Sequence, residues 1–218
     1  ACELAEPWRL PTLAPLATRR SLFTHTQLMG VVNITPDSFS DGGLHVSAEN
    51  ALARIRALEA EGAAVIDLGA ESTRPGAQPL PPGEEWARLE PVLRRLASEP
   101  PRAEISIDTR HADTAARALE VLKGWDPARL WLNDVTGFEN EALRSVAARA
   151  GVRLAVMHSL GIPPSRERTL ELQRDPVAQI LAWGERALEA LEQSGVPRER
   201  AVIDPGIGFG KTPEQSLL

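Results

Sequence analysis

The chain has 218 residues and a formal net charge of −6, with 43% hydrophobic and 25% charged residues, so it is long enough for one domain and has the composition of a globular protein. The acidic balance argues against nonspecific nucleic-acid binding, which needs clustered positive charge. The single cysteine, Cys2, excludes an internal disulfide and fits a cytoplasmic location, and no apolar run reaches the roughly 18 residues that predict a membrane span.

Short apolar runs alternate with amphipathic stretches along most of the chain. Residues 1–26 contain Pro7, Pro11 and Pro15 and are expected to be a leader, whereas residues 27–218 are expected to form one domain. Short apolar runs are typical of strands that are buried on both faces of a parallel sheet. The predicted strands are Leu28–Ile34, Ala63–Leu68, Ala103–Ile107, Leu130–Leu132, Val152–Met157 and Ala201–Ile203.

The stretches between these strands predict helices. Ser47 is expected to cap a helix that Gly62 ends, and Pro91 is expected to kink or shorten the next helix. Two alanine-rich helices are expected over residues 111–122 and 140–150. The clearest apolar stripe, which predicts core packing, consists of Val177, Ile180, Leu181, Gly184, Leu188 and Leu191.

Polar residues directly follow all six predicted strands. In a barrel all strand ends converge on one mouth, whereas an open sheet places its site at one switch point. Polar groups at every end therefore favour the barrel. Six strands do not close an eight-stranded barrel, so we expect an α/β fold of the (β/α)8 TIM-barrel type with about its first six βα units present and its C-terminal part missing. The polar ends are Asn33, Glu71–Thr73, Asp108, Asn133–Asp134, Met157–His158 and Asp204.

Two loops carry residues suited to ligand binding. Phe39 lies in the loop NITPDSFSDGG and is a large apolar residue at a loop tip, where it suits a lid over a ring, although ordinary loop packing is the alternative. Arg74 lies in ESTRPGA with Ser72 and Thr73, and its planar guanidinium suits phosphate, although a solvated surface arginine is the alternative.

Three strand-end residues are expected to point into the barrel mouth. Asp108, Asn133 and Asp204 each follow an apolar strand. Two carboxylates and an amide match a 2-amino-4-oxo-pyrimidine edge, because a carboxylate accepts hydrogen bonds and an amide both donates and accepts. Each residue taken singly could instead cap the following helix.

Other sequence patterns are set aside. The segment DPGIGFGKT is not a P-loop, because Pro205 stands where the first glycine is required. Four histidines and one cysteine show no zinc spacing, and His158 is expected to be structural.

The chain resembles the dihydropteroate synthases, pterin-binding enzymes of folate biosynthesis and the target of sulfonamides. The resemblance implies a (β/α)8 barrel that joins 7,8-dihydropterin-6-ylmethyl diphosphate to 4-aminobenzoate and releases diphosphate. It rests on MGVVNITPDSFSDGG (29–43), IDLGAESTRPGA (66–77), SIDT (106–109), NDVTG (133–137), MHSLG (157–161) and DPGIGFGKT (204–212).

The resemblance also implies roles for individual residues. Asp108, Asn133 and Asp204 would hold the pterin, and Asn33 would bind Mg²⁺ together with the diphosphate. Thr73 would help to bind the phosphates. The pterin faces would be lined by Val31, Val135, Met157 and Phe209, and the aminobenzoate pocket would be built by Phe39, Arg74 and Pro75.

The end of the chain departs from the family pattern. Ser-Arg-Lys and Arg-Val-His motifs, which follow the seventh and eighth strands in the family, are absent here. The resemblance further implies a homodimer. Two alternatives stay open, namely a methyltetrahydrofolate–corrinoid methyltransferase with a related pterin barrel, and a pterin-binding module without catalysis.

Overall fold

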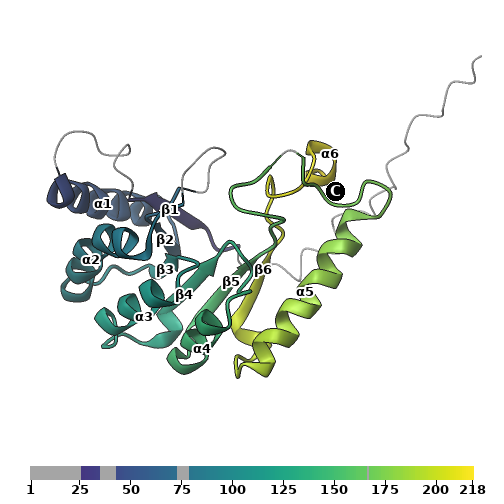
Figure 1. The fold of residues 1–218 in the computed structure, drawn as a ribbon. Coiled ribbons are helices and arrows are strands. Elements are labelled where there is room, and N and C mark those ends of the chain that lie inside the picture. The colour runs from purple at the N-terminus through teal and green to yellow at the C-terminus, as the bar shows by residue number, and fades with distance from the viewer. Residues whose placement is uncertain (1–25, 35–42, 73–78, 166) are drawn as a thin grey trace, which may run out of the picture.

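The computed structural model describes residues 26–34, 43–72, 79–165 and 167–218. Six parallel strands pair in chain order, so each strand lies beside the one that precedes it (Figure 1). This sequential order is that of consecutive βα units. The strands are β1 (Met29–Asn33), β2 (Val65–Gly69), β3 (Glu104–Asp108), β4 (Leu130–Asp134), β5 (Arg153–Met157) and β6 (Ala201–Asp204).

Helices follow one another along the sheet in the same order. Helix α1 packs on α2, α2 on α3 and α3 on α4, and α5 runs beside β6 (Figure 1). Short 3₁₀ turns at Pro127–Arg129 and Arg198–Arg200 precede β4 and β6. The helices are α1 (Gly43–Ala60), α2 (Pro82–Ser98), α3 (Ala112–Val121), α4 (Glu141–Ala150), α5 (Pro176–Gln193) and α6 (Pro213–Ser216).

Successive side chains of each strand lie on opposite faces of the sheet. On one face, Ile66, Leu68, Ile105 and Ile107 are fully buried in the core beneath the helices. The residues between them include Asp67, which lies on the opposite face because successive side chains of a strand alternate. All six predicted strands are confirmed, with ends that differ from the prediction by no more than two residues.

One helix prediction was wrong, and one part of another was wrong. Helix α1 begins at Gly43, so Ser47 lies in its second turn and does not cap it. Helix α2 continues through Pro91 to Ser98, so the proline does not shorten it. Pro91 lacks the N–H that would bond to the carbonyl of Ala87, but Ala87 is exposed, so water can satisfy that carbonyl.

The apolar stripe of α5 is only partly in the core. Gly184 and Leu191 are buried, and a Cβ added at Gly184 would lie 3.8 Å from the side chain of Ile203. Val177 and Leu181 are exposed, the latter to 65%. The prediction that the whole stripe packs in the core was therefore wrong, because the stripe is wider than the surface that α5 buries.

The predicted leader lies, except for residue 26, outside the described residues. Within the described ranges, none of the helices combines the length and apolarity needed to cross a bilayer.

Truncation of a buried strand residue should destabilise the fold far more than truncation of the exposed helix face. Leu68 is fully buried in β2, so Leu68→Ala should lower the free energy of unfolding by about 2–5 kcal/mol. Leu181→Ala should change it by about 0.5 kcal/mol or less. Urea unfolding measures both, and equal midpoints for the two variants would contradict this assignment of the core.

Candidate functional site

The parallel register aligns the strand-end residues in one row. Asn33 pairs with Gly69, Gly69 with Asp108, and Asp108 with Asn133. Asp204 pairs with Met157 at the ends of β5 and β6. The structure thus brings the predicted residues to one edge of the sheet, which is where parallel α/β folds bind ligands.

Gly69 makes room for the carboxylate of Asp108. A Cβ added at position 69 would lie 3.0 Å from Oδ2 of Asp108, so a larger residue would displace the carboxylate. Burial raises the pKa of Asp108 well above 3.8, and the nearby carboxylates of Asp67 and Asp134 raise it further. An acid in this setting favours either a proton or a ligand that supplies N–H donors.

Asp67 is a site residue that the sequence analysis missed. It is buried within β2, and its Oδ2 accepts a hydrogen bond of 3.0 Å from Nδ2 of Asn133. Burial raises the pKa of Asp67, and the bond from Asn133 offsets part of this effect. The only signal in the sequence is a charged residue within the apolar run VIDLG. Asp67 therefore fixes the orientation of the Asn133 amide.

Asp204 accepts hydrogen bonds from its own loop and from the loop that follows β5. Its Oδ1 accepts the N–H of Gly206 at 2.7 Å, and its carbonyl accepts the N–H of His158 at 2.9 Å. One carboxylate oxygen thus closes a local turn at Gly206. It does not cap the following helix, which was the alternative role, because Thr212 caps α6. The side chain is exposed at the end of β6.

The residues expected to line the pterin faces differ in exposure. Met157 and Val135 are buried, and Phe209 is partly buried. Val31 is 55% exposed on β1, and Asn33 is exposed at the end of the same strand. Four further predicted site residues lie outside the described residues, namely Phe39, Thr73, Arg74 and Pro75.

A buried ammonium joins the loops that follow β5 and β6. Nζ of Lys211 lies 2.7 Å from Nδ1 of His158 and donates to the carbonyls of Phe209 at 3.0 Å and His158 at 3.3 Å. The His158 ring also makes an edge-on contact with Trp183. Burial lowers the pKa of Lys211 to about 8, and burial together with the Lys211 charge lowers the pKa of His158 to about 4. His158 is structural in this arrangement.

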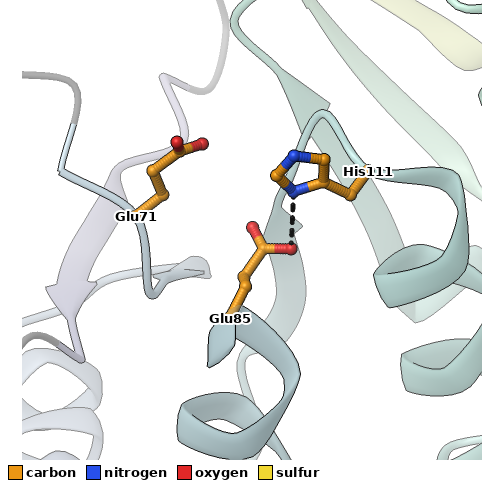
Figure 2. A group of neighbouring side chains, drawn as sticks. All are labelled: Glu71, Glu85 and His111. Atoms are coloured by element: carbon orange, nitrogen blue, oxygen red, sulfur yellow. Dashed lines mark hydrogen bonds and ion pairs between the residues drawn. The ribbon is translucent and has the colours of Figure 1, made fainter. Parts of the chain in front are cut away.

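Two carboxylates and an imidazole lie beside the row, from elements next to Asp108. Figure 2 shows Glu71, Glu85 and His111, with the imidazole bonded to Glu85. One ligand atom from each lies within 4.8 Å of the others, a spacing that a metal ion could bridge. Arg110, however, donates to both oxygens of Glu71 at 2.8 Å. The cation of this cluster is therefore the Arg110 guanidinium.

Parallel strands in strictly sequential order, with polar groups gathered at their carboxyl ends, are the arrangement of the α/β-barrel class of ligand-binding proteins. The chain belongs to the pterin binding enzyme family, which it matches over residues 29–218.

Relatives and solved structures agree with this family. The folate synthesis bifunctional protein of Chlamydia trachomatis is 46% identical over 199 residues, which is 88% of this chain and 43% of that protein. The chain thus spans less than half the length of this curated relative. The structure resembles dihydropteroate synthase of Xanthomonas albilineans with 4-aminobenzoic acid, with a TM-score of 0.77 and 34% identity over 89% of this chain and 66% of that one. For the Anaplasma phagocytophilum dihydropteroate synthase with bound 6-hydroxymethylpterin-monophosphate the values are 0.74 and 36%, over 88% and 70%.

The buried His158 should make stability depend on pH. The lowered pKa means that, between pH 6.5 and about 4, His158 is protonated in the unfolded chain and neutral in the folded protein. The free energy of unfolding should therefore fall as pH falls through this window. His158→Gln keeps an acceptor for Lys211 but does not titrate, so its unfolding free energy should fall less steeply. Denaturant unfolding across this range measures the difference, and identical slopes would count against the assignment.

Proposed function

We propose that the protein is a dihydropteroate synthase, which transfers the 7,8-dihydropterin-6-ylmethyl group from its diphosphate to 4-aminobenzoate. The observation that carries the proposal is the row formed by Gly69, Asp108 and Asn133, with Asp67 beneath the amide. Family membership and the pterin and aminobenzoate ligands of the similar structures support it.

Recognition of the pterin follows from the charges of the site. The 2-amino-4-oxo-pyrimidine edge carries N–H donors, which the Asp108 carboxylate would accept. Asn133 uses one N–H for Asp67 and keeps its carbonyl and second N–H for the ring. Asp204 supplies a second carboxylate from the end of β6. The ring faces would rest on Met157, Val135, Phe209 and Val31.

The substitution at the 6-methylene depends mainly on stabilising the positive charge that develops there. As diphosphate leaves, positive charge develops on the methylene and spreads over the electron-rich pterin. Carboxylates already in place at Asp108 and Asp204 favour that charge without reorganisation. The amine of 4-aminobenzoate is itself a nucleophile, so the protein has only to position it. We assign Thr73 to the phosphates, and Phe39, Arg74 and Pro75 to the aminobenzoate pocket, on the resemblance.

Mg²⁺ is the metal that the family resemblance implies, and Asn33 could supply one of its oxygen ligands. Asn33 ends β1 with an exposed amide, whose carbonyl is the kind of neutral oxygen ligand that Mg²⁺ accepts. Mg²⁺ commonly takes one or two protein ligands and completes its shell with water and phosphate oxygens. When bound, it would neutralise charge on the departing diphosphate. We also propose a homodimer, on the basis of the resemblance. We propose a cytoplasmic location because the chain has a single cysteine.

Replacement of Asp108 tests the recognition of the pterin. Asp108→Asn removes the charged acceptor, so affinity for the pterin diphosphate should fall about 100-fold, as expected for lost hydrogen bonds to a charged group. Asp113→Asn is the matched control, because Asp113 is exposed on α3. Calorimetry measures binding and urea unfolding checks the fold. An Asp108→Asn protein that binds as tightly as the Asp113→Asn protein would refute the assignment.

The raised pKa of Asp108 should appear in the pH dependence of binding. The carboxylate accepts N–H donors only when ionised, and its pKa lies well above 3.8. Pterin affinity should therefore weaken as pH falls, at a pH where an ordinary aspartate is still ionised. Calorimetric titrations over a pH series measure this dependence, and Asp108→Asn should flatten it. A series that is as steep in the variant as in the parent would contradict the prediction.

The activity itself is tested with both substrates. The complete protein should release diphosphate and form dihydropteroate only when pterin diphosphate and 4-aminobenzoate are both present. Binding of pterin without product would instead favour the module without catalysis.

A further inference from the structure

Two carboxylates outside the strand-end row face the segment that directly follows Asp108. We infer that Glu71 and Glu85 are positioning residues that hold the Thr109–His111 segment and thereby fix the Asp108 carboxylate in the pterin site. The inference rests on the proposed function, because it concerns the same site.

Glu85 binds the first and last residues of this segment. It lies in the first turn of α2, and its side chain is fully buried. Its Oε2 accepts the hydroxyl of Thr109 at 2.9 Å and lies 3.1 Å from Nδ1 of His111. The backbone N–H of His111 in turn donates to Oγ1 of Thr109 at 3.1 Å. These contacts close a ring that leaves the segment little freedom.

Glu71 binds the middle residue. Arg110 donates to both of its oxygens, and Oε1 also accepts the backbone N–H of Leu80 at 2.9 Å. Burial acts to raise the pKa of Glu71, but the bonds from Arg110 and Leu80 hold it below its ordinary value. Glu71 is thus a charged partner of Arg110, and it also brings residues 71 and 80 of the connection between β2 and α2 together.

All three residues after Asp108 therefore contact a carboxylate, either Glu71 from the β2–α2 connection or Glu85 from the first turn of α2. On the other side, the N–H of Thr109 donates to the carbonyl of Asn133 at 2.9 Å. Asp108 is held between its strand neighbours and this segment. A shift of the segment would move the carboxylate relative to Asn133, with which it shares the pterin.

The charge of Glu85 also points to a role beyond packing. Its Oε1 is buried and has no hydrogen-bond partner among the described residues, and a buried carboxylate without full pairing is costly. A glutamine would fill the same volume without a charge. Together with burial, Asp67 and Asp134, the charges of Glu85 and Glu71 raise the pKa of Asp108. Removal of the Glu85 charge would lower the pKa of Asp108 and favour its ionised form. A loss of pterin affinity in Glu85→Gln would therefore come from displacement of Asp108 and not from a change in its charge.

The test compares Glu85→Gln with Glu84→Gln in the complete protein. Glu84 is exposed in the same helical turn, so the control makes the same charge change without touching the segment. Glu85→Gln should weaken pterin diphosphate binding about tenfold, as the loss of hydrogen bonds to a charged group predicts, and should leave the KM for 4-aminobenzoate within about twofold. Glu84→Gln should match the parent in both.

Thr109→Val provides a second variant, because it removes one hydroxyl and leaves Glu85 in place. It should also weaken pterin binding, and the double variant with Glu85→Gln should lose less affinity than the sum of the two single losses, since the two residues share one contact. This variant decides the matter should Glu85→Gln fail to fold.

The outcomes separate this inference from the proposed function. A parent protein that forms no dihydropteroate would overturn the proposed function. An active parent in which Glu85→Gln binds pterin as Glu84→Gln does would overturn the inference alone. Equal losses for both substrates together with a lowered urea midpoint would show a purely structural role and would also overturn it. Calorimetric binding of Zn²⁺ or Mn²⁺ by the parent, lost in Glu85→Gln, would show a metal site in place of the Arg110 pair.

Discussion

The parallel hydrogen-bond register between β2, β3 and β4 is the constraint on which the site depends. It places Gly69, Asp108 and Asn133 side by side. The register is itself fixed by the opposite face, where Ile66, Leu68, Ile105 and Ile107 must lie beneath the helices. A slip of one residue would turn these apolar side chains toward the site and the polar ones toward the core. Core packing and ligand recognition are therefore specified by the same alternation.

The density of acids near Asp108 has a physical cost that neighbouring contacts reduce. Asp67 is bonded to Asn133, Asp134 accepts three bonds from Thr136 and Phe138, and Glu71 is neutralised by Arg110. Asp108 has no comparable partner among the described residues, and it carries the strongly raised pKa. Perturbed groups of this kind gather at functional sites. The absence of donors to Asp108 among the described residues supports its proposed role in recognising a ring edge rich in N–H groups.

The sequence was sufficient to predict the strands and the strand-end residues, because both follow from short-range patterns. Apolar runs predicted all six strands, and polar residues at their ends marked Asp108, Asn133 and Asp204. Asp67 and Glu85 were missed because their roles depend on contacts between distant residues. Glu85 looks like Glu84 in sequence, and only the packing of α2 against the end of β3 distinguishes them. The exposed face of α5 and the continuation of α2 through Pro91 likewise depend on which surfaces are covered.

Lys211 holds together the two loops that are expected to contact the faces of the pterin. Its ammonium joins the loop that begins after Met157 to the loop that contains Phe209. Two walls expected to flank the pterin are thus cross-linked by one cation before any ligand arrives. Loops held in this way would lose little conformational entropy on binding, so more of the contact free energy would appear as affinity. A fixed separation of the two loops would also favour flat heterocycles over bulkier ones by shape.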